Sequence, residues 1–190
     1  MNKIEQELRN ALQVLRIGGV ILYPTDTIWG IGCDATNSNA VDIVFKIKQR
    51  EESKSLIILI DQQEKLNKYL NEVPAMAWNL MEVNDKPLTI IYPGAKGLEP
   101  RVINEDGSVA IRLTKDDFCS KLIQKLGKPI VSTSANISGE LAPGKFQEIS
   151  EQILNQVDYI VKLRQQESTI SQPSAIIKLA LNGEFKIIRK

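Results

Sequence analysis

The segment KPIVSTSANISGE, residues 128–140, joins a short apolar run to a dense group of small polar side chains. Its first part, PIVS, has the composition of a buried strand. Hydroxyl and amide residues then crowd the turn before Gly139: Ser132, Thr133, Ser134, Asn136 and Ser138. A plain surface turn often contains such residues. They would equally form the polar floor of a binding site, because small side chains admit a ligand and offer both donors and acceptors.

Segments typical of strands and of helices are interleaved along the rest of the chain. Short apolar runs predict strands at residues 20–24, 55–60, 87–94, 108–113, 129–132, 158–161, 174–179 and 185–189. Helical periodicity covers residues 4–15, 38–50, 63–83 with a break near Pro74, 115–126 and 146–155. Asn37 or Ser38 is the expected N-cap of the second helix. We therefore predict an α/β or α+β fold, a twisted mixed β-sheet with flanking helices, in a single domain over residues 1–190.

Composition and charge exclude several classes of protein. The apolar fraction of 43% and the charged fraction of 25% are those of an ordinary soluble globular chain. The net charge of +1 provides no global basic field of the kind that marks a dedicated nucleic-acid binder. No apolar run approaches the roughly 20 residues that span a bilayer, and MNKIEQELRN lacks the apolar region of a signal peptide. We expect a cytoplasmic protein without membrane contact.

The absence of histidine narrows the chemistry further. The chain has no His and only two cysteines, Cys33 and Cys119. Ser-His-Asp hydrolysis, Cys–His nucleophiles and Cys/His metal sites are therefore excluded. We expect both thiols to be buried or half-buried. Any reaction must use lysine, arginine, carboxylates, hydroxyls and a metal bound through carboxylate or phosphate groups.

Polar residues follow the first predicted strand in the stretch YPTDTIWGIGCD, which we predict to be a loop. Thr25, Asp26 and Thr27 come directly after the strand, at the edge where α/β sheets usually bind ligands. A loop that satisfies its own backbone amides is the simpler explanation, and on this stretch alone we favour it.

The cations Lys48, Arg50 and Arg112 each allow either a structural role or a role in binding an anion. Lys48 and Arg50 lie at a helix end, where cations ordinarily complement the helix dipole. They converge on one anion only if the helix ends there, because residues i and i+2 point apart on a helix. Arg112 is the single charge in SVAIRL, which fits an edge strand or a solvated face. If that strand feeds a cleft, the planar guanidinium suits bidentate binding of a carboxylate or phosphate.

Read together, four blocks resemble the YrdC/TsaC family, the threonylcarbamoyl-adenylate synthases: GGVILYPTDTIWGIGCDATN, IKQR, SVAIRL and PIVSTSANISG. Their order and spacing match over nearly the whole chain. The resemblance implies a YrdC-like twisted sheet with a deep basic cavity. It also implies a nucleotidyltransferase that combines L-threonine, bicarbonate and ATP into threonylcarbamoyl-AMP and pyrophosphate. This product serves the threonylcarbamoyladenosine modification of tRNA next to the anticodon.

The resemblance also implies site residues and partners. The family's KxR motif matches Lys48 and Arg50, the expected catalytic residues, and its SxN motif matches Ser134 and Asn136. The implied ATP contacts are Lys48, Arg50, Lys54, Ser108, Ser134, Asn136 and Arg189. The implied threonine contacts are Thr27, Arg112, Ser132 and Ser174. Mg²⁺ is expected to bind through the ATP phosphates, with no metal site in the protein itself, and a tRNA threonylcarbamoyl transferase is the expected downstream partner.

Departures from the family pattern leave alternatives open. Glu51 and Ser55 replace prolines after the KxR motif, and Ala175 and Lys178 stand where Thr and Asp are usual. A paralogue with reduced activity is one alternative. An RNA-binding module of the same fold, without adenylation, is a second, although the near-neutral charge disfavours it. Carbamoyl-adenylate chemistry of the hydrogenase-maturation type is a third, but the large multidomain chain and zinc-finger cysteines of those proteins are absent.

The KxR motif generates the first testable prediction. We expect Arg50→Ala to abolish turnover with little loss of fold stability, because Arg50 is expected to neutralise phosphate charge during adenylation. Steady-state pyrophosphate release and urea unfolding of the same preparation measure the two quantities. Unfolding of the variant would instead assign Arg50 a structural role.

Overall fold

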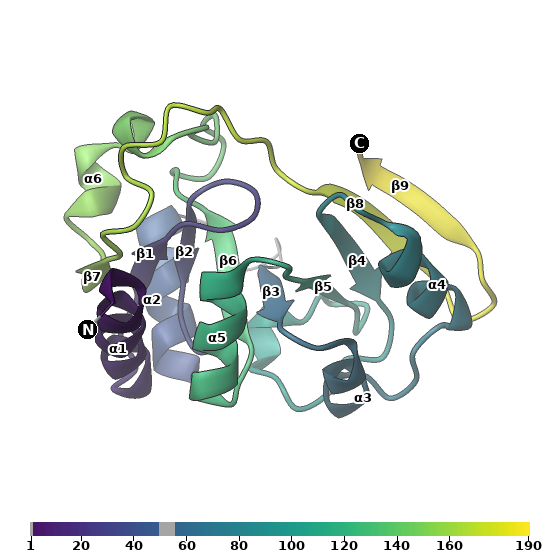
Figure 1. Cartoon of the computed structure of the whole chain (residues 1–190). Coiled ribbons are helices and arrows are strands. Elements are labelled where there is room, and N and C mark those ends of the chain that lie inside the picture. Colours follow the sequence, from purple (N-terminus) through teal and green to yellow (C-terminus); the bar gives the residue numbers. More distant parts are fainter. Residues whose placement is uncertain (1, 50–55) are drawn as a thin grey trace.

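The computed structural model describes residues 2–49 and 56–190. Within these residues, nine strands form one twisted sheet in the order β7-β1-β2-β6-β3-β5-β4-β8-β9 (Figure 1). The strands are β1 Ile21–Tyr23, β2 Gly30–Gly32, β3 Ile57–Ile60, β4 Leu88–Tyr92, β5 Val109–Leu113, β6 Ile130–Ser134, β7 Tyr159–Ile160, β8 Ala175–Leu179 and β9 Phe185–Arg189. The β1–β7, β3–β5 and β4–β8 pairs are parallel, and the other neighbours are antiparallel. The predicted α/β architecture with a mixed sheet is confirmed.

Helices flank this sheet, as the sequence predicts. They are α1 Lys3–Arg16, α2 Ser38–Lys48, α3 Leu66–Tyr69, α4 Ala75–Val83, α5 Asp117–Leu126 and α6 Glu151–Leu154, with short 3-10 turns at Gln63–Lys65, Pro100–Val102 and Phe146–Glu148. The predicted break near Pro74 is confirmed, because Pro74 is the N-cap of α4. The helix predicted at 146–155 is instead a 3-10 turn followed by α6.

Two apolar cores form on opposite faces of the sheet because strand side chains alternate. In β1, Ile21 and Tyr23 join the core that contains the buried residues of α1 and α5. Leu22, between them, joins the larger core that contains the buried face of α2. Figure 1 shows α1 and α5 side by side on one face of the sheet, with α2 behind it.

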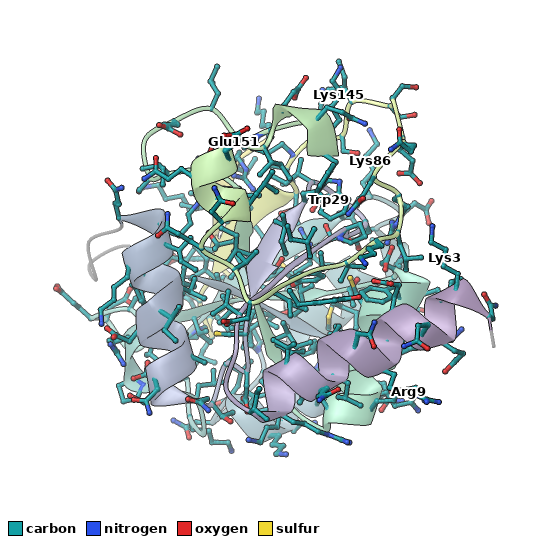
Figure 2. The ribbon with its side chains drawn as sticks, turned by 90° about the vertical axis from the view of Figure 1, so that its left-hand side faces the viewer. Lys3, Arg9, Trp29, Lys86, Lys145 and Glu151 are labelled. Atoms are coloured by element: carbon teal, nitrogen blue, oxygen red, sulfur yellow. The ribbon has the colours of Figure 1, made fainter. Side chains whose placement is uncertain are left out.

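Most charged side chains lie at the surface; among the described residues, the buried ones are Glu7, Asp34, Lys48, Glu99 and Arg112. Figure 2 shows Lys3 and Arg9 of α1 and Glu151 of α6 pointing outward, whereas Trp29 lies inward. Trp29 is buried and packs against Phe146 with ring centroids 4.8 Å apart. Both cysteines are buried free thiols, as expected.

Strand β2 differs from the sequence prediction, which gives a loop for these residues. The strand has only three residues, two of them glycines, which are rare in strands. The structure explains why glycine is needed. A Cβ atom at Gly32 would lie 2.4 Å from the carbonyl oxygen of Val131 and 2.6 Å from a ring carbon of Tyr23. This close approach pairs β2 with β6 and brings the preceding loop, residues 24–29, beside the polar end of β6.

The two ends of helix α2 are fixed by its capping residues. Asn37 is its N-cap, as predicted, and its side chain accepts a hydrogen bond from the Ala40 amide at 3.1 Å. Gln49 has a left-handed backbone (φ 47°) and stops the helix directly after Lys48. The helix therefore ends at Lys48, while Arg50 lies outside the described residues, so the convergence of the two cations stays a prediction.

The close packing at β2 generates the second testable prediction. We expect Gly32→Ala to lower the free energy of unfolding by about 3 kcal/mol, because a backbone carbonyl cannot rotate away from the added methyl group. Gly30→Ala, in the same strand, is the matched control: its Cβ would lie 3.2 Å from the Ser132 hydroxyl, which can turn aside. Urea unfolding measures both variants. Equal losses would contradict the packing argument.

Candidate functional site

A cavity of about 400 Å³ opens over the central strands. Its volume lies within the range of small-molecule sites, roughly 300–1,000 Å³. Its lining brings together six of the predicted site residues, which are spread from position 27 to position 189 in the chain: Thr27, Arg112, Ser132, Ser134, Ser174 and Arg189. Of the described residues that line it, none is an aspartate or a glutamate.

The floor of the cavity is a row of paired strand residues. Ser132 of β6 pairs with Ile57 of β3, and Ile57 pairs with Ala110 of β5, which pairs with Ile91 of β4. All four line the cavity. Arg112 lies two residues along β5 from Ala110 and therefore points to the same face of the sheet. The sheet register thus places Arg112 and the hydroxyl of Ser132 on the wall of the same cavity.

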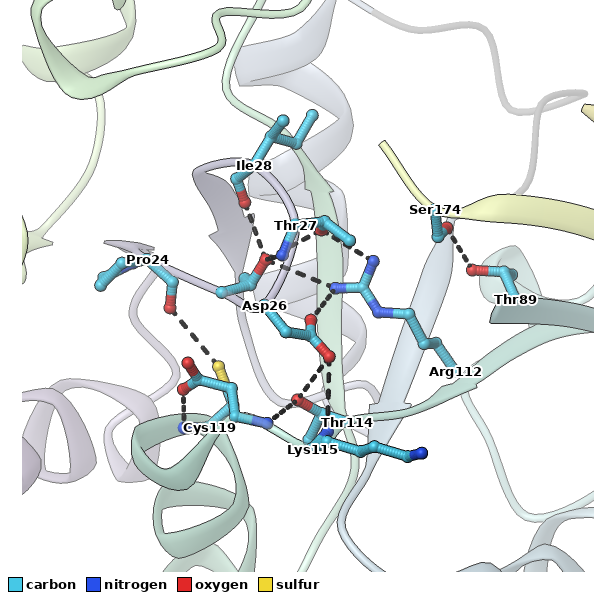
Figure 3. Close-up of polar contacts among 12 residues, drawn as sticks. Pro24, Asp26, Thr27, Ile28, Thr89, Arg112, Thr114, Lys115, Cys119 and Ser174 are labelled. Carbon is cyan, nitrogen blue, oxygen red and sulfur yellow. Dashed lines mark hydrogen bonds and ion pairs between the residues drawn. The ribbon is translucent and has the colours of Figure 1, made fainter. Parts of the chain in front are cut away.

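Arg112 is the buried cation of this cavity. Its side chain is 4% exposed and lies on the interior strand β5, so neither an edge strand nor a solvated face explains it. Nη1 donates to Thr27 Oγ1 at 2.9 Å, and Nη2 lies 3.2 Å from Asp26 Oδ1. Figure 3 shows the guanidinium pointing at these two residues. Its Nε–H is buried without a hydrogen-bond partner among the described residues.

The loop after β1 combines both alternatives that the sequence left open. Thr25 Oγ1 donates to the carbonyl of Ile28 at 2.8 Å and accepts from the Thr27 amide at 3.0 Å, so Thr25 satisfies the local backbone. Thr27 instead lines the cavity and holds Arg112. Asp26 Oδ2 lies 3.4 Å from Thr114 Oγ1 and 3.3 Å from the Lys115 amide, both of which donate to it. The loop is therefore stabilised by its own hydrogen bonds and also contributes Thr27 to the cavity.

The opposite wall comes from the C-terminal strands. The segment of residues 162–174 crosses the top of the molecule to reach β8 (Figure 1). At its end, the Ser174 hydroxyl shares a 2.7 Å hydrogen bond with Thr89, and Arg189 Nε donates to the Ser174 carbonyl at 2.9 Å. Burial lowers the pKa of Arg189, and the positive charge of Arg112 lowers it further. Two cations that repel each other across one cavity favour an anionic ligand between them.

Lys48, Ser134 and Asn136 form one cluster beside this cavity. Lys48 is 1% exposed, and its ammonium donates to the carbonyls of Ser134 and Asn136, both at 2.5 Å. Asn136 Oδ1 lies 3.2 Å from the same ammonium, while Asn136 Nδ2 donates to the carbonyls of Ile137 and Glu140, each at 2.9 Å. The amide of Asn136 is thus occupied by the turn itself. Among the three, only Ser134 lines the cavity.

The remaining predicted residues fall outside the lining. Ser108 is buried behind the wall, and its hydroxyl donates to Asp106 Oδ1 at 2.6 Å. Arg50 and Lys54 lie outside the described residues. Direct contact of Lys48, Arg50, Lys54, Ser108 and Asn136 with a nucleotide stays a prediction.

The cavity also contains residues that the sequence analysis did not single out. They include Trp29, Asn104, Ala142 and Pro173. Trp29 belongs to a quoted block, so the block signalled it indirectly. Thr133, which is one of the polar residues named at the end of the strand at 129–132, also lines the cavity. Asn104 carries no sequence signal of its own, because the turn NEDG at 104–107 reads as an ordinary polar turn.

Residues 2–49 and 56–190 contain no group of three His, Cys, Asp or Glu side chains arranged to hold a metal ion. Over the same residues, the longest apolar helical stretches fall short of what a membrane crossing requires.

Known proteins resemble this chain in sequence. The Sua5_yciO_yrdC family, described as telomere recombination, matches residues 13–190. The threonylcarbamoyl-AMP synthase of Pseudoalteromonas translucida (strain TAC 125) is 34% identical over 177 residues, which cover 92% of this chain and 93% of that protein.

Solved structures resemble it in fold. Sua5 of P. abyssi, complexed with L-threonine, has a TM-score of 0.84 at 30% identity, with 92% of this chain and 51% of that chain covered. YciO of E. coli has a TM-score of 0.84 at 25% identity, with 98% and 89% covered. This chain spans about half the length of the Sua5 protein.

The buried cluster generates the third testable prediction. We expect Lys48→Met to lower the free energy of unfolding by about 2 kcal/mol, because it removes the charged donor from the Ser134 and Asn136 carbonyls. Lys46→Met, in the same helix, is the matched control, since Lys46 is 73% exposed and forms a surface ion pair with Asp42. Urea unfolding compares the two. A loss as small as that of Lys46→Met would show that the cluster is not a structural support.

Proposed function

Because the chain belongs to the Sua5/YciO/YrdC family, we propose that it is a threonylcarbamoyl-AMP synthase acting on L-threonine, bicarbonate and ATP. The curated relative of similar length has that name, and the P. abyssi relative binds L-threonine. The observation that carries the proposal is the composition of the cavity: two arginines beside five hydroxyl residues, with no carboxylate among its described lining residues. Such a lining suits substrates that carry a carboxylate and phosphates.

The threonine end is the part around Arg112. A guanidinium offers paired donors that match a carboxylate, and the buried Nε–H of Arg112 lacks a partner that a bound carboxylate would supply. Thr27, Ser132 and Ser174 place small hydroxyl groups around the same end. These groups suit the amine and hydroxyl of threonine. A site that hydrogen-bonds the substrate hydroxyl rejects analogues lacking it far better than an apolar pocket does.

The nucleotide end is the part beside Ser134. Lys48 and Asn136 hold the turn that presents Ser134. We assign Arg50, Lys54 and Arg189 to the phosphates on the strength of the family motif and of charge. Mg²⁺ fits as an ion that arrives with ATP, since the described lining offers hydroxyls rather than carboxylates and Mg²⁺ commonly binds through substrate phosphates.

The proposed reaction has two steps. The neutral threonine amine forms a bond to the carbon of bicarbonate, which loses water to leave a carbamate. A carbamate oxygen then attacks the α-phosphorus of ATP, and the bond to pyrophosphate breaks. The protein contributes mainly positioning and charge neutralisation, which lysine and arginine supply without a histidine.

The product implies a partner. Threonylcarbamoyl-AMP is an activated acyl donor, so a tRNA threonylcarbamoyl transferase is the enzyme that would consume it. We place the reaction in the cytoplasm, since two buried free thiols suit a reducing compartment.

This function generates the fourth testable prediction. We expect the protein to release pyrophosphate from ATP and Mg²⁺ only when both L-threonine and bicarbonate are present, because the carbamate is the nucleophile. A coupled phosphate assay with inorganic pyrophosphatase measures the rate, and single omissions are the controls. Release that persists without threonine or without bicarbonate would contradict the proposal. RNA binding with a steep salt dependence and no ATP turnover would favour the RNA-binding alternative.

A further inference from the structure

Asn104 carries the only carboxamide among the described residues that line the cavity. A carboxamide is the side chain best suited to read the edge of a nucleobase, since it offers a donor and an acceptor. The family resemblance instead names Asn136 as an ATP contact. The amide of Asn136, however, is used by Lys48 and by the carbonyls of Ile137 and Glu140. Asn104 is therefore the amide placed to meet a base.

Asn104 lies at the end of the cavity opposite the threonine end. Its side chain is bonded to Ser108, directly before β5, whereas Arg112 is near the end of that strand. Ser108 and Arg112 are four residues apart along an extended strand, which separates their positions by about 13 Å. The register of β3 with β5 and with β6 places Ser134 at the same end as Ser108. Asn104 thus faces the half of the cavity that we assign to the nucleotide.

The turn at residues 104–108 fixes which way this amide points. Asn104 Nδ2 donates to Ser108 Oγ at 3.0 Å. The Ser108 hydroxyl donates its single proton to Asp106 Oδ1 at 2.6 Å, and the Ser108 amide donates to the same oxygen at 3.0 Å. Ser108 Oγ can therefore only accept from Asn104. Rotating the amide by half a turn would set two acceptor oxygens against each other, so Oδ1 is kept away from Ser108.

Asp106 supports this orientation through its charge. Lys178 Nζ lies 2.5 Å from Asp106 Oδ2. The hydrogen bond from Lys178, followed by that from Ser108, lowers the pKa of Asp106 to about 2. The carboxylate therefore stays ionised at neutral pH and accepts the hydrogen bond from the Ser108 hydroxyl. Lys178 and Asp106 are both about half exposed, so we expect Lys178 to contribute little by itself.

We propose that Asn104 is a specificity-determining residue that selects adenine over guanine, with Ser108 and Asp106 as the residues that position it. The inference rests on the proposed function, since it assumes a nucleoside triphosphate in this cavity. The Oδ1 atom accepts a hydrogen bond from the exocyclic amine of adenine. Guanine presents the O6 acceptor at the corresponding position and is repelled. A fixed amide discriminates, whereas an amide free to turn would accept both bases.

The test compares ATP with GTP in pyrophosphate release dependent on threonine and bicarbonate. For Asn104→Leu we expect the ATP/GTP ratio of kcat/KM to fall about tenfold, through loss of ATP activity, because one hydrogen bond to the base is removed. For Ser108→Ala we expect a similar fall through a gain of GTP activity, because the amide can now turn. Asn155→Leu, on the exposed C-cap of α6, is the control for an asparagine-to-leucine change.

The outcomes separate this inference from the proposed function. Thermal unfolding first shows that each variant is folded. A wild-type protein without preference for ATP, or folded variants with an unchanged ATP/GTP ratio, would overturn the role of Asn104 while leaving the synthase activity standing. If pyrophosphate release does not depend on threonine and bicarbonate, the proposed function fails. The ratio of ATP affinity to GTP affinity, measured by calorimetric titration of the wild type and the variants, then tests the role of Asn104 independently.

Discussion

The site depends on the burial of one cation, Arg112, in the middle of the sheet. A guanidinium that is 4% exposed is stable only with partners, because a buried unpaired charge is very unfavourable. Asp26 and Thr27 supply those partners and thereby tie the loop after β1 to the central strand β5. The Nε–H of Arg112 still lacks a partner among the described residues, and an unsatisfied buried donor costs about 1–3 kcal/mol. A bound carboxylate would remove that cost, so the same arrangement that stabilises the loop also prepares a threonine site.

The position of that loop depends in turn on glycine. Strand β2 fits between β1 and β6 only because Gly32 has no side chain, since a Cβ would lie 2.4 Å from the carbonyl of Val131. The pairing of β2 with β6 places residues 24–29 beside Ser132 and Ser134. Backbone packing at one residue therefore determines whether Thr27 and Arg112 can meet.

Much of the fold was predictable, because the periodic apolar patterns of α1 and α5 and the continuous apolar run of β3 follow simple rules of burial. Strand β2 was not, since two glycines in three residues give no strand signal and the pairing arises from tertiary contact. Within the site, the family resemblance named six residues that line the cavity, four of them in the quoted blocks. The blocks could not distinguish an amide that faces a cavity from one that holds a turn. Asn136 is bonded on all sides by its own segment, whereas Asn104, in an unremarkable polar turn, lines the hollow. That distinction depends on which carbonyls lie nearby, and the sequence does not contain it.

The cations of this protein divide into two kinds, and the division bears on what the protein can bind. Lys48 is buried among carbonyl oxygens and supports a turn, while Arg112 and Arg189 line the cavity. The whole chain has a net charge of only +1, so its surface offers no extended field for a polyanion. Within the cavity, however, two guanidiniums lie together, and Asp26, which forms an ion pair with Arg112, is not among the described lining residues. Charge concentrated in a hollow of about 400 Å³ favours a small anion that can enter it, and disfavours a duplex that would need many phosphate contacts across the surface. The distribution of charge, rather than its total, therefore supports a small-molecule synthase over an RNA-binding module.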